Sequence, residues 1–367
     1  MKQKNENIGI MTFWNVPNYG TFAQAYALQK VIAEIKKSAT VQQINHLDKY
    51  HHDFYYSVIP KGSRKSLSYW KTFVKNIFTQ KQIKRTKQLF VENYNTIPHT
   101  EELTKENANN FKFDTVVLGS DIVWDYSIRV FNYDQMLFGL GLNTDKVISY
   151  AASFGTVKSL DGAPEYVVEA LKKMQNISVR DENSADLVER VTKNRPQVVL
   201  DPALIWDFKT DENIKESKYS NYIAVYGQDF TEEFKQNLVK FAKENNKQLV
   251  QLDCHKDDGS WCDVVVKQKD MTPYEWIALF KGADMIATST FHGIMFSIIF
   301  NKKFAWCKTP FIDAKCDKFL KKLGIYDRFD DKSAVAEMYA AEWDYEKIEK
   351  YLNEERKKSI DYLKKAL

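Results

Sequence analysis

Short apolar runs that alternate with helical patterns along most of the chain are the feature that most constrains its fold. The first run, Ile8 to Phe13, leads through a loop containing Gly20 into a helix of about four turns, which is the opening of a βαβ unit. Further strands are predicted at residues 113–118, 146–152, 177–179, 198–200, 222–226, 248–252, 285–288 and 303–306, with helices at 164–175, 182–191, 231–245, 273–281 and 293–300. Such alternation favours parallel sheets with helices on both faces.

The length of the chain predicts two such domains. The 367 residues exceed what a typical single core needs, and 44% of them are apolar, so a sizeable core can be buried. No long linker marks the boundary, and we place it between residues 176 and 177. We therefore expect a first domain at 1–176, a second at 177–340, and a C-terminal segment at 341–367 that forms a long amphipathic packing helix.

Charge is nearly balanced overall but uneven along the chain. The net charge of +4 is lower than a general binder of nucleic acid would usually carry. Between Phe54 and Val91 there is no acidic residue, yet nine basic ones occur, and aromatic residues are interleaved at helical spacing. Two interpretations stay open: the apolar side packs on the first domain with the lysines solvated, or the helix rests on an anionic membrane surface.

Four scattered cysteines predict free thiols in a reducing compartment, because none forms a CxxC pair or a zinc spacing. The N-terminal residues contain no apolar run of signal-peptide length, and no stretch approaches the roughly 20 apolar residues of a membrane span. We expect a cytoplasmic protein without a metal, in peripheral contact with the membrane at most.

Polar clusters follow several predicted strands, where open α/β sheets bind their ligands. Asn18-Tyr19-Gly20 precedes a helix start and suits either an anion site or an ordinary cap. Gly119-Ser120-Asp121 suits either a hydroxyl-rich ligand or a helix cap. Arg180 can hold a carboxylate or phosphate as a planar fork, or form an ion pair with a nearby acid.

The sharpest local signal is Ser289-Thr290-Phe291-His292-Gly293, between an apolar strand and a predicted helix. The helix dipole disfavours a cation at this end, so His292 is expected to be neutral and suited to acid–base chemistry. The remaining histidines have no comparable setting, and we interpret them as surface or structural. The chain carries no HExxH, GxSxG, GxxxxGK[ST] or GxGxxG at a useful place, which argues against zincins, serine hydrolases, P-loop enzymes and common dinucleotide sites.

Taken in order, these clusters resemble the polysaccharide pyruvyl transferase family. The matching pieces extend from about residue 8 to residue 328, and they are Thr12-Phe13-Trp14-Asn15, Asn18-Tyr19-Gly20, Gln24-Ala25-Tyr26-Ala27-Leu28, Leu118-Gly119-Ser120-Asp121 with Trp124, Tyr150-Ala151-Ala152-Ser153-Phe154-Gly155, Ser178-Val179-Arg180-Asp181, Leu200-Asp201-Pro202, Phe291-His292-Gly293, Phe296-Ser297, Asn301-Lys302, and Leu323-Gly324 with Arg328. Two departures stand out. Ser289-Thr290 replaces the family's usual Asp-Ser pair, and Lys315 lies where an arginine is common.

The resemblance implies two Rossmann-like domains, similar to two-domain (GT-B-like) glycosyltransferases, with the site in the interdomain cleft and the C-terminal helix at 341–367 packing back toward the first domain. It also implies transfer of a pyruvyl group from phosphoenolpyruvate to a sugar of a cell-surface glycan or its lipid-linked precursor, without a cofactor. His292 and Asp121 would be catalytic. The donor would contact Arg180, Lys315, Ser289, Thr290 and Gly293 in the second domain, and the acceptor would contact Asn18, Tyr19, Gly20, Gln24, Ser120, Trp124 and Ser153 in the first.

Two other functions stay open at this point. A nucleotide-sugar glycosyltransferase can have the same two-domain shape, since fold does not decide function. A non-catalytic glycan-binding member of the family is the second, because the missing carboxylate at Ser289 weakens any scheme that needs one beside the histidine.

Overall fold

The computed structural model describes residues 5–57, 59, 64–252, 259–307, 319–326 and 335–367. The chain divides into two compact units, one formed by Met1–Trp206 with Glu355–Leu367 and the other by Asp207–Glu354. Each unit is built on its own parallel sheet of five strands.

The sheet of the first unit has the strand order β3-β2-β1-β4-β5, and every pairing in it is parallel. Its strands are β1 (Asn7–Met11), β2 (Thr40–Asn45), β3 (His99–Glu102), β4 (Thr115–Leu118) and β5 (Val147–Ser149). The order 3-2-1-4-5 is that of a doubly wound nucleotide-binding fold. In this fold the first strands are added on one side of β1 and the later strands on the other side, so the strand order reverses beside β1.

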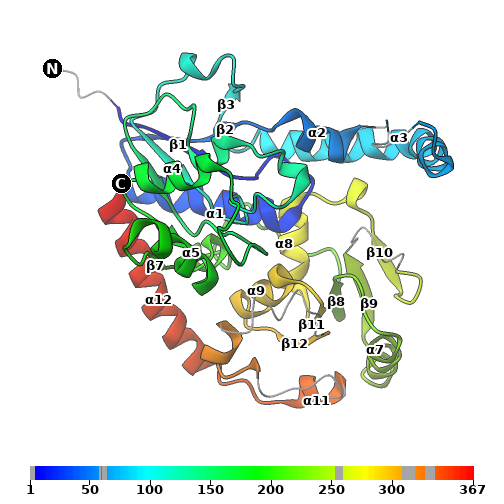
Figure 1. Ribbon diagram of the computed structural model, residues 1–367. Helices are drawn as coiled ribbons and strands as arrows, with labels where there is room; N and C mark the ends of the chain where they lie inside the picture. The colour runs from blue at the N-terminus through cyan, green and yellow to red at the C-terminus, as the bar shows by residue number, and fades with distance from the viewer. Residues whose placement is uncertain (1–4, 58, 60–63, 253–258, 308–318, 327–334) are drawn as a thin grey trace. The chain divides into compact units, whose positions relative to one another are not determined.

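Helices connect these strands and cover the sheet (Figure 1). They are α1 (Tyr19–Ile35), α2 (Lys49–Tyr56), α3 (Leu67–Tyr94), α4 (Glu165–Lys173), α5 (Glu182–Thr192) and α6 (Pro202–Ile205), with 3-10 turns η1 (Ala108–Asn110), η2 (Arg129–Phe131) and η3 (Gln135–Phe138). α1 is buried along most of its length, whereas α3 buries only Tyr69, Leu89, Phe90 and Tyr94 among its 28 residues. Figure 1 shows α3 extending beside α2 as an arm of this unit.

The first unit is longer than the sequence predicted, because two short strands extend its sheet. β6 (Ser178–Val179) and β7 (Gln197–Val198) pair in parallel, and single bridges join Ile148 to Asn176 and Ala152 to Val179 beside β5. The backbone of Arg180 also donates to the carbonyl of Ala152 over 3.3 Å. The boundary expected after residue 176 is therefore replaced by one after Trp206, and residues 177–206 belong to the first unit.

The last helix, α12 (Tyr345–Ala366), ends against the first unit. The Tyr362 hydroxyl donates to the carbonyl of Ser149 over 2.9 Å, and the Ser359 hydroxyl accepts from the amide of Leu200 over 3.1 Å. Arg356 Nε donates to the carbonyl of Leu204 over 2.7 Å. These bonds fix Glu355–Leu367 as part of the first unit, while the start of the helix belongs to the second.

The second unit repeats the architecture of the first with the strand order β10-β9-β8-β11-β12, again wholly parallel. Its strands are β8 (Tyr222–Tyr226), β9 (Gln248–Leu252), β10 (Val264–Val266), β11 (Met285–Thr288) and β12 (Lys303–Trp306), and its helices are α7 (Glu232–Glu244), α8 (Pro273–Gly282), α9 (Phe291–Ile299) and α11 (Val335–Ala340), with the 3-10 turn η4 (Gln268–Asp270). Two Rossmann-like units with parallel sheets confirm the predicted fold class.

In the part of the chain that the structure describes, no helix is both long and apolar enough to cross a membrane.

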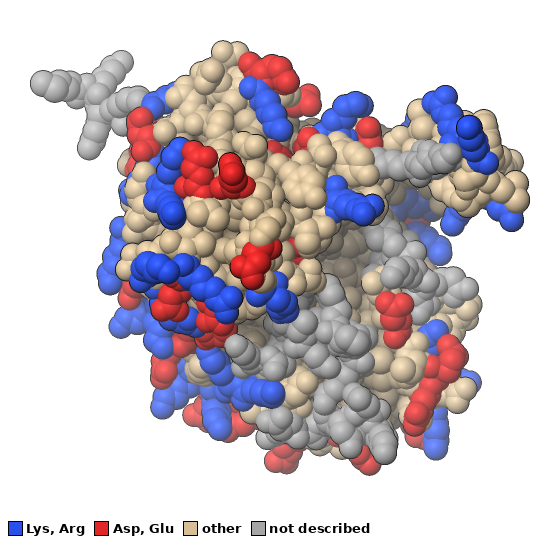
Figure 2. Space-filling view, viewed as in Figure 1, with Lys and Arg blue, Asp and Glu red and all other residues tan. Residues whose placement is uncertain are grey.

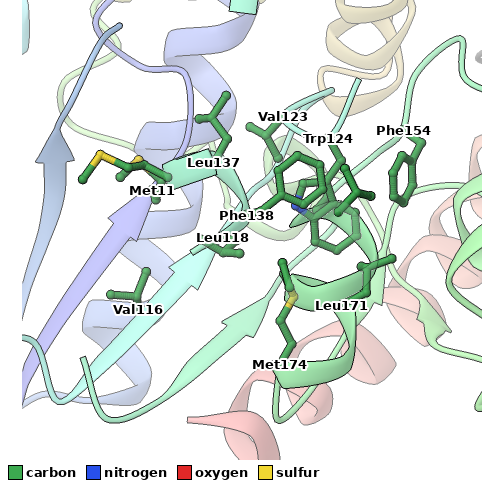
Figure 3. Close-up of a cluster of buried hydrophobic side chains, with 14 of the residues drawn as sticks. Met11, Val116, Leu118, Val123, Trp124, Leu137, Phe138, Phe154, Leu171 and Met174 are labelled. Carbon is green, nitrogen blue, oxygen red and sulfur yellow. The ribbon is translucent and has the colours of Figure 1, made fainter. Parts of the chain in front are cut away.

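The core of the first unit packs aromatic rings among aliphatic side chains (Figure 3). Trp124 stacks on Phe138 with ring centroids 5.9 Å apart and contacts Phe154 at 5.3 Å. Leu171 and Met174 of the α4 region belong to the same buried cluster. Buried aromatic rings of this size contribute much of the hydrophobic stabilisation of a domain.

Candidate functional site

In the second unit, the carboxyl ends of β8 and β11 are joined by side chains of the Ser289-Thr290 segment. Thr288 Oγ1 donates to the carbonyl of Tyr226 over 2.6 Å. The Ser289 hydroxyl donates to the carbonyl of Gln228 over 2.6 Å and accepts from the Gln228 amide over 2.9 Å. Ser289 is thus occupied in fixing the loop after β8, which differs from the donor contact expected of it.

The start of α9 is closed by its own cap. Thr290 is the N-cap, and its hydroxyl accepts from the amide of Gly293 over 3.0 Å. A Cβ atom at Gly293 would lie 1.9 Å from Thr288 Oγ1, so only glycine lets the helix start this close to the strand end. Thr290 and the Gly293 amide are thus engaged in positioning the helix, and donor binding by these two residues stays a prediction.

His292 stands out within α9. Every other residue of this helix is buried, whereas His292 is partly exposed at the second helical position. A neutral imidazole can accept or donate a proton, so this position suits acid–base chemistry at the edge of the second sheet.

In the first unit, Asp121, Arg180 and Asp201 form a buried charge cluster after β4, β6 and β7. Arg180 Nη1 lies 3.0 Å from Asp201 Oδ2, and Nη2 lies 3.7 Å from Asp121 Oδ1. The Arg180 side chain is 9% exposed and that of Asp201 1%. Thr21 of α1 also donates to Asp121 Oδ2 over 3.2 Å. The structure therefore shows the ion pair that the sequence left open for Arg180, and it places this residue in the first unit, not the second.

Most residues expected to bind the acceptor are buried or make hydrogen bonds within the first unit. Asn18 is exposed, but its side chain caps α1 by accepting from the Thr21 amide over 3.2 Å. Gln24 is fully buried and donates to Thr12 Oγ1 and to two backbone carbonyls. Buried positions are also found for Tyr19, Gly20, Ser120 and Ser153.

Ser153 and Trp124 show that a polar or aromatic residue after a strand does not always face a ligand. The Ser153 hydroxyl donates to Asp181 over 2.6 Å and accepts from the Gly155 amide over 3.0 Å, which ties two loops together. Trp124 has no exposed surface and lies in the aromatic core, so it cannot stack on a sugar. Lys315 lies outside the described residues.

A cavity of about 670 Å³ opens at the carboxyl edge of the first sheet, and none of the site residues suggested by the sequence lines it. Asn15 follows β1, Asn45 ends β2 and Glu102 ends β3, and all three line it. The Asn15 amide donates to Asn45 Oδ1 over 3.1 Å, while Asn15 Oδ1 is buried and has no hydrogen-bond partner within the described part of the chain. Further polar lining comes from the loop after β2, from α2, from α3 and the residue after it, and from β3 and the loop that follows it; it includes His46, Asp48, Lys49, His52, Lys87, Asn95, His99, Thr104, Lys105 and Glu106.

Three of the histidines interpreted as surface or structural thus surround this cavity. His52 Nε2 lies 3.1 Å from Lys87 Nζ, and His99 Nδ1 lies 2.7 Å from the carbonyl of Ile97. The rule that ligands bind at the carboxyl ends of strands could have pointed here, because β1, β2 and β3 are neighbours in the sheet. Within the described ranges, no group of three or more His, Cys, Asp or Glu side chains is arranged to hold a metal ion.

His46 forms a buried ion pair at the base of the cavity. Its Nε2 lies 2.6 Å from Asp134 Oδ2, and its Nδ1 lies 2.8 Å from the carbonyl of Leu103. Burial alone would lower the pKa of His46, but the hydrogen bond and charge of Asp134, with the carbonyl of Leu103, raise that pKa above its ordinary value of 6.5.

This pair predicts a pH-dependent stability. A raised folded-state pKa adds stability that is full below about pH 6.5 and is lost as the pH rises through the folded pKa. We expect the difference in unfolding free energy between the wild type and His46→Asn, measured in urea from mildly acidic to alkaline pH, to shrink as the pH rises. Asp134→Asn should remove the same pH-dependent component, and a constant difference across this range would contradict the assignment.

Comparison with known proteins is consistent with these features. The family model described as polysaccharide pyruvyl transferase matches residues 18–309, which include both the Asp121–Arg180–Asp201 cluster and the His292 segment. No curated protein matches the chain.

Solved structures similar to this chain include a glycotransferase of kitacinnamycin, at 12% identity and a TM-score of 0.47, with 99% of this chain and 98% of that chain covered. The UDP-GlcNAc 2-epimerase from Neisseria meningitidis bound to UDP-GlcNAc has 11% identity and a TM-score of 0.46, with coverages of 98% and 99%. The E. coli heptosyltransferase WaaC with ADP has 9% identity and a TM-score of 0.39, with coverages of 95% and 99%. Since the family model spans most of the sequence, the chain belongs to the polysaccharide pyruvyl transferase family.

Proposed function

We propose that this chain transfers a pyruvyl group from phosphoenolpyruvate to two hydroxyls of one sugar, in a cell-surface glycan or its precursor. Family membership supports the reaction class. The observation that carries the proposal is His292, the single partly exposed residue at the start of an otherwise buried helix.

The chemistry requires two proton movements. The methylene carbon of the donor gains a proton and becomes a methyl group, while its C2 carbon forms bonds to two sugar oxygens. The bond between C2 and the phosphate oxygen breaks, and phosphate leaves. One of the two hydroxyl protons ends on the new methyl group, and the other ends on phosphate. A neutral histidine beside the donor can deliver and accept these protons in turn, and we assign this role to His292.

We assign the acceptor to the cavity of the first unit. A sugar presents hydroxyls that both donate and accept hydrogen bonds, and the lining supplies the amides of Asn15 and Asn45 with the carboxylate of Glu102. The buried Asn15 Oδ1 has no hydrogen-bond partner among the residues that the structure describes, and a hydroxyl of the acceptor would satisfy it. We prefer this cavity to the residues that the sequence had suggested for the acceptor, because all of them except Asn18 are buried.

Phosphoenolpyruvate serves as a co-substrate, and no other cofactor enters the scheme. Cell-surface glycans are commonly built on lipid carriers at the cytoplasmic face of the membrane, so we propose a cytoplasmic enzyme in peripheral contact with that face. The acceptor would then be a lipid-linked oligosaccharide.

The test is acceptor-dependent release of phosphate from phosphoenolpyruvate. The purified protein is incubated with phosphoenolpyruvate and a panel of sugars, and the products are examined by mass spectrometry and by NMR for a ketal methyl group. Phosphate release together with a ketal supports the proposal. Release of a nucleotide from UDP- or GDP-sugars, with no consumption of phosphoenolpyruvate, would show a glycosyltransferase instead.

A further inference from the structure

The exposed face of α3 carries an unusual stripe of apolar and basic side chains. Leu67, Trp70, Val74, Ile77 and Phe78 follow one another at helical spacing, so they share one face. Phe78 is 81% exposed, Leu67 is 72% exposed, and the other three are each about half exposed. The packing of the first unit therefore leaves these large apolar side chains uncovered, while Tyr69, Leu89 and Phe90 of the same helix are buried, so only part of the apolar side packs on the domain.

The same stripe becomes basic toward the end of the helix. Lys81, Lys84 and Arg85 continue the spacing on this face, and all three are exposed. Lys71 and Lys75 flank the apolar part. At 1.5 Å of rise per residue, the stripe from Leu67 to Arg85 is about 27 Å long. In Figure 2 the charged side chains that appear at the end of the α3 arm are basic.

We propose that this stripe, Leu67 to Arg85, is a docking surface for an anionic lipid membrane. An interfacial helix buries apolar side chains at the boundary between headgroups and acyl chains, while its basic residues contact anionic headgroups. The absence of any acidic residue between Phe54 and Val91 matches a negatively charged surface. Trp70 has the amphipathic ring that is enriched at membrane interfaces.

A second copy of the chain fits this face less well. Two stripes in contact would bury Lys81, Lys84 and Arg85 against apolar side chains or against one another. Burying unpaired cations is costly, and this stretch of the sequence supplies no carboxylate to pair with them. Charge complementarity thus favours the lipid surface over a dimer.

The location of the stripe also links it to the acceptor. Lys87 and Val91, which follow Arg85 on the same helix, line the cavity assigned above to the sugar. Docking through α3 would bring that cavity to the membrane surface, where a lipid-linked sugar is presented. This link depends on the proposed function, whereas the docking itself does not.

The test is flotation of the full chain with two kinds of vesicle, phosphatidylcholine alone and phosphatidylcholine with phosphatidylglycerol, at low and high salt. We expect binding only to the anionic vesicles, weakened by salt. The triple variant Lys81→Glu, Lys84→Glu and Arg85→Glu should weaken it by about 100-fold. The double variant Trp70→Ser and Phe78→Ser should weaken it by at least about 10-fold.

A matched control reverses three exposed lysines of α12 through Lys347→Glu, Lys350→Glu and Lys357→Glu, which changes the net charge equally. This control should bind as the wild type does. Equal binding to both vesicles, no binding at low salt, or equal loss in the control would overturn the proposal. So would a dimer in light scattering that Trp70→Ser and Phe78→Ser converts to a monomer, because the stripe would then be covered by a second copy.

Failure of this proposal can be told apart from failure of the proposed function. If both hold, the Lys81, Lys84 and Arg85 variant should turn over a soluble sugar normally but a vesicle-borne acceptor poorly. If the reaction is something else, vesicle binding should still follow the stripe.

Discussion

Replacing His292 by alanine should lower pyruvyl transfer by about 100-fold or more while leaving the fold intact. The expected loss is the usual contribution of a positioned acid–base group. Stability should change little, because the side chain is partly exposed and alanine is favourable in a helix. Initial rates of phosphate release and a thermal melt of the same preparation provide the two readouts.

His292→Gln is the matched control for proton transfer. Glutamine keeps a hydrogen-bonding side chain but does not titrate in the working range, so it should be nearly as inactive as alanine. Near wild-type turnover in either variant would exclude a catalytic role for His292. Loss of the folded state in both variants would assign the residue to structure instead.

Replacing Arg180 by methionine should lower the free energy of unfolding by about 3–5 kcal/mol, the cost of leaving a buried ion pair without one partner. Asp201 is 1% exposed and would keep its charge without the guanidinium 3.0 Å away. Asp121 would lose a neighbour at 3.7 Å. Urea unfolding monitored by circular dichroism gives this number directly.

Arg195 is a suitable surface control for Arg180, because it forms more ion pairs than Arg180 but is more exposed. It lies within 2.8 Å of carboxylates of Glu182, Asp186 and Glu189, but its side chain is 43% exposed. Arg195→Met should cost far less, because exposed ion pairs contribute little. Similar losses at the two arginines would contradict a structural role for the buried cluster.

Arg180→Lys then separates structure from donor binding. Lysine keeps the charge but not the planar fork. A rise in the KM for phosphoenolpyruvate that greatly exceeds the rise for the acceptor would support the donor contact expected from the sequence. If stability falls but the KM values for phosphoenolpyruvate and for the acceptor rise equally, Arg180 would be a structural residue.

The alternation of strands and helices was enough to predict two Rossmann-like units, because apolar runs and helical periodicity are properties of the local sequence. The boundary was predicted too early. β6 and β7 have two residues each, and only their hydrogen bonds to one another and their bridges to the β5 segment show that they extend the first sheet. Pairing between segments that are distant along the chain leaves no local signal.

The candidate site shows the same limit. His292 was predicted from a strand, a polar loop and a helix start, which are consecutive in the sequence. Trp124 and Ser153 occur in similar settings, yet they are buried, and burial depends on neighbours such as Phe138 and Asp181 from other segments. The cavity was missed because its residues come from five separate stretches that meet only in the folded sheet.

The most direct test of the central claim is the change in melting temperature on adding phosphoenolpyruvate, compared with UDP- and GDP-sugars. A ligand that binds only the folded protein stabilises it by about 2.7 kcal/mol at one hundred times its Kd. The proposed function predicts a rise in melting temperature with phosphoenolpyruvate that grows with its concentration, and none with the nucleotide sugars. A rise with a nucleotide sugar and none with phosphoenolpyruvate would contradict it.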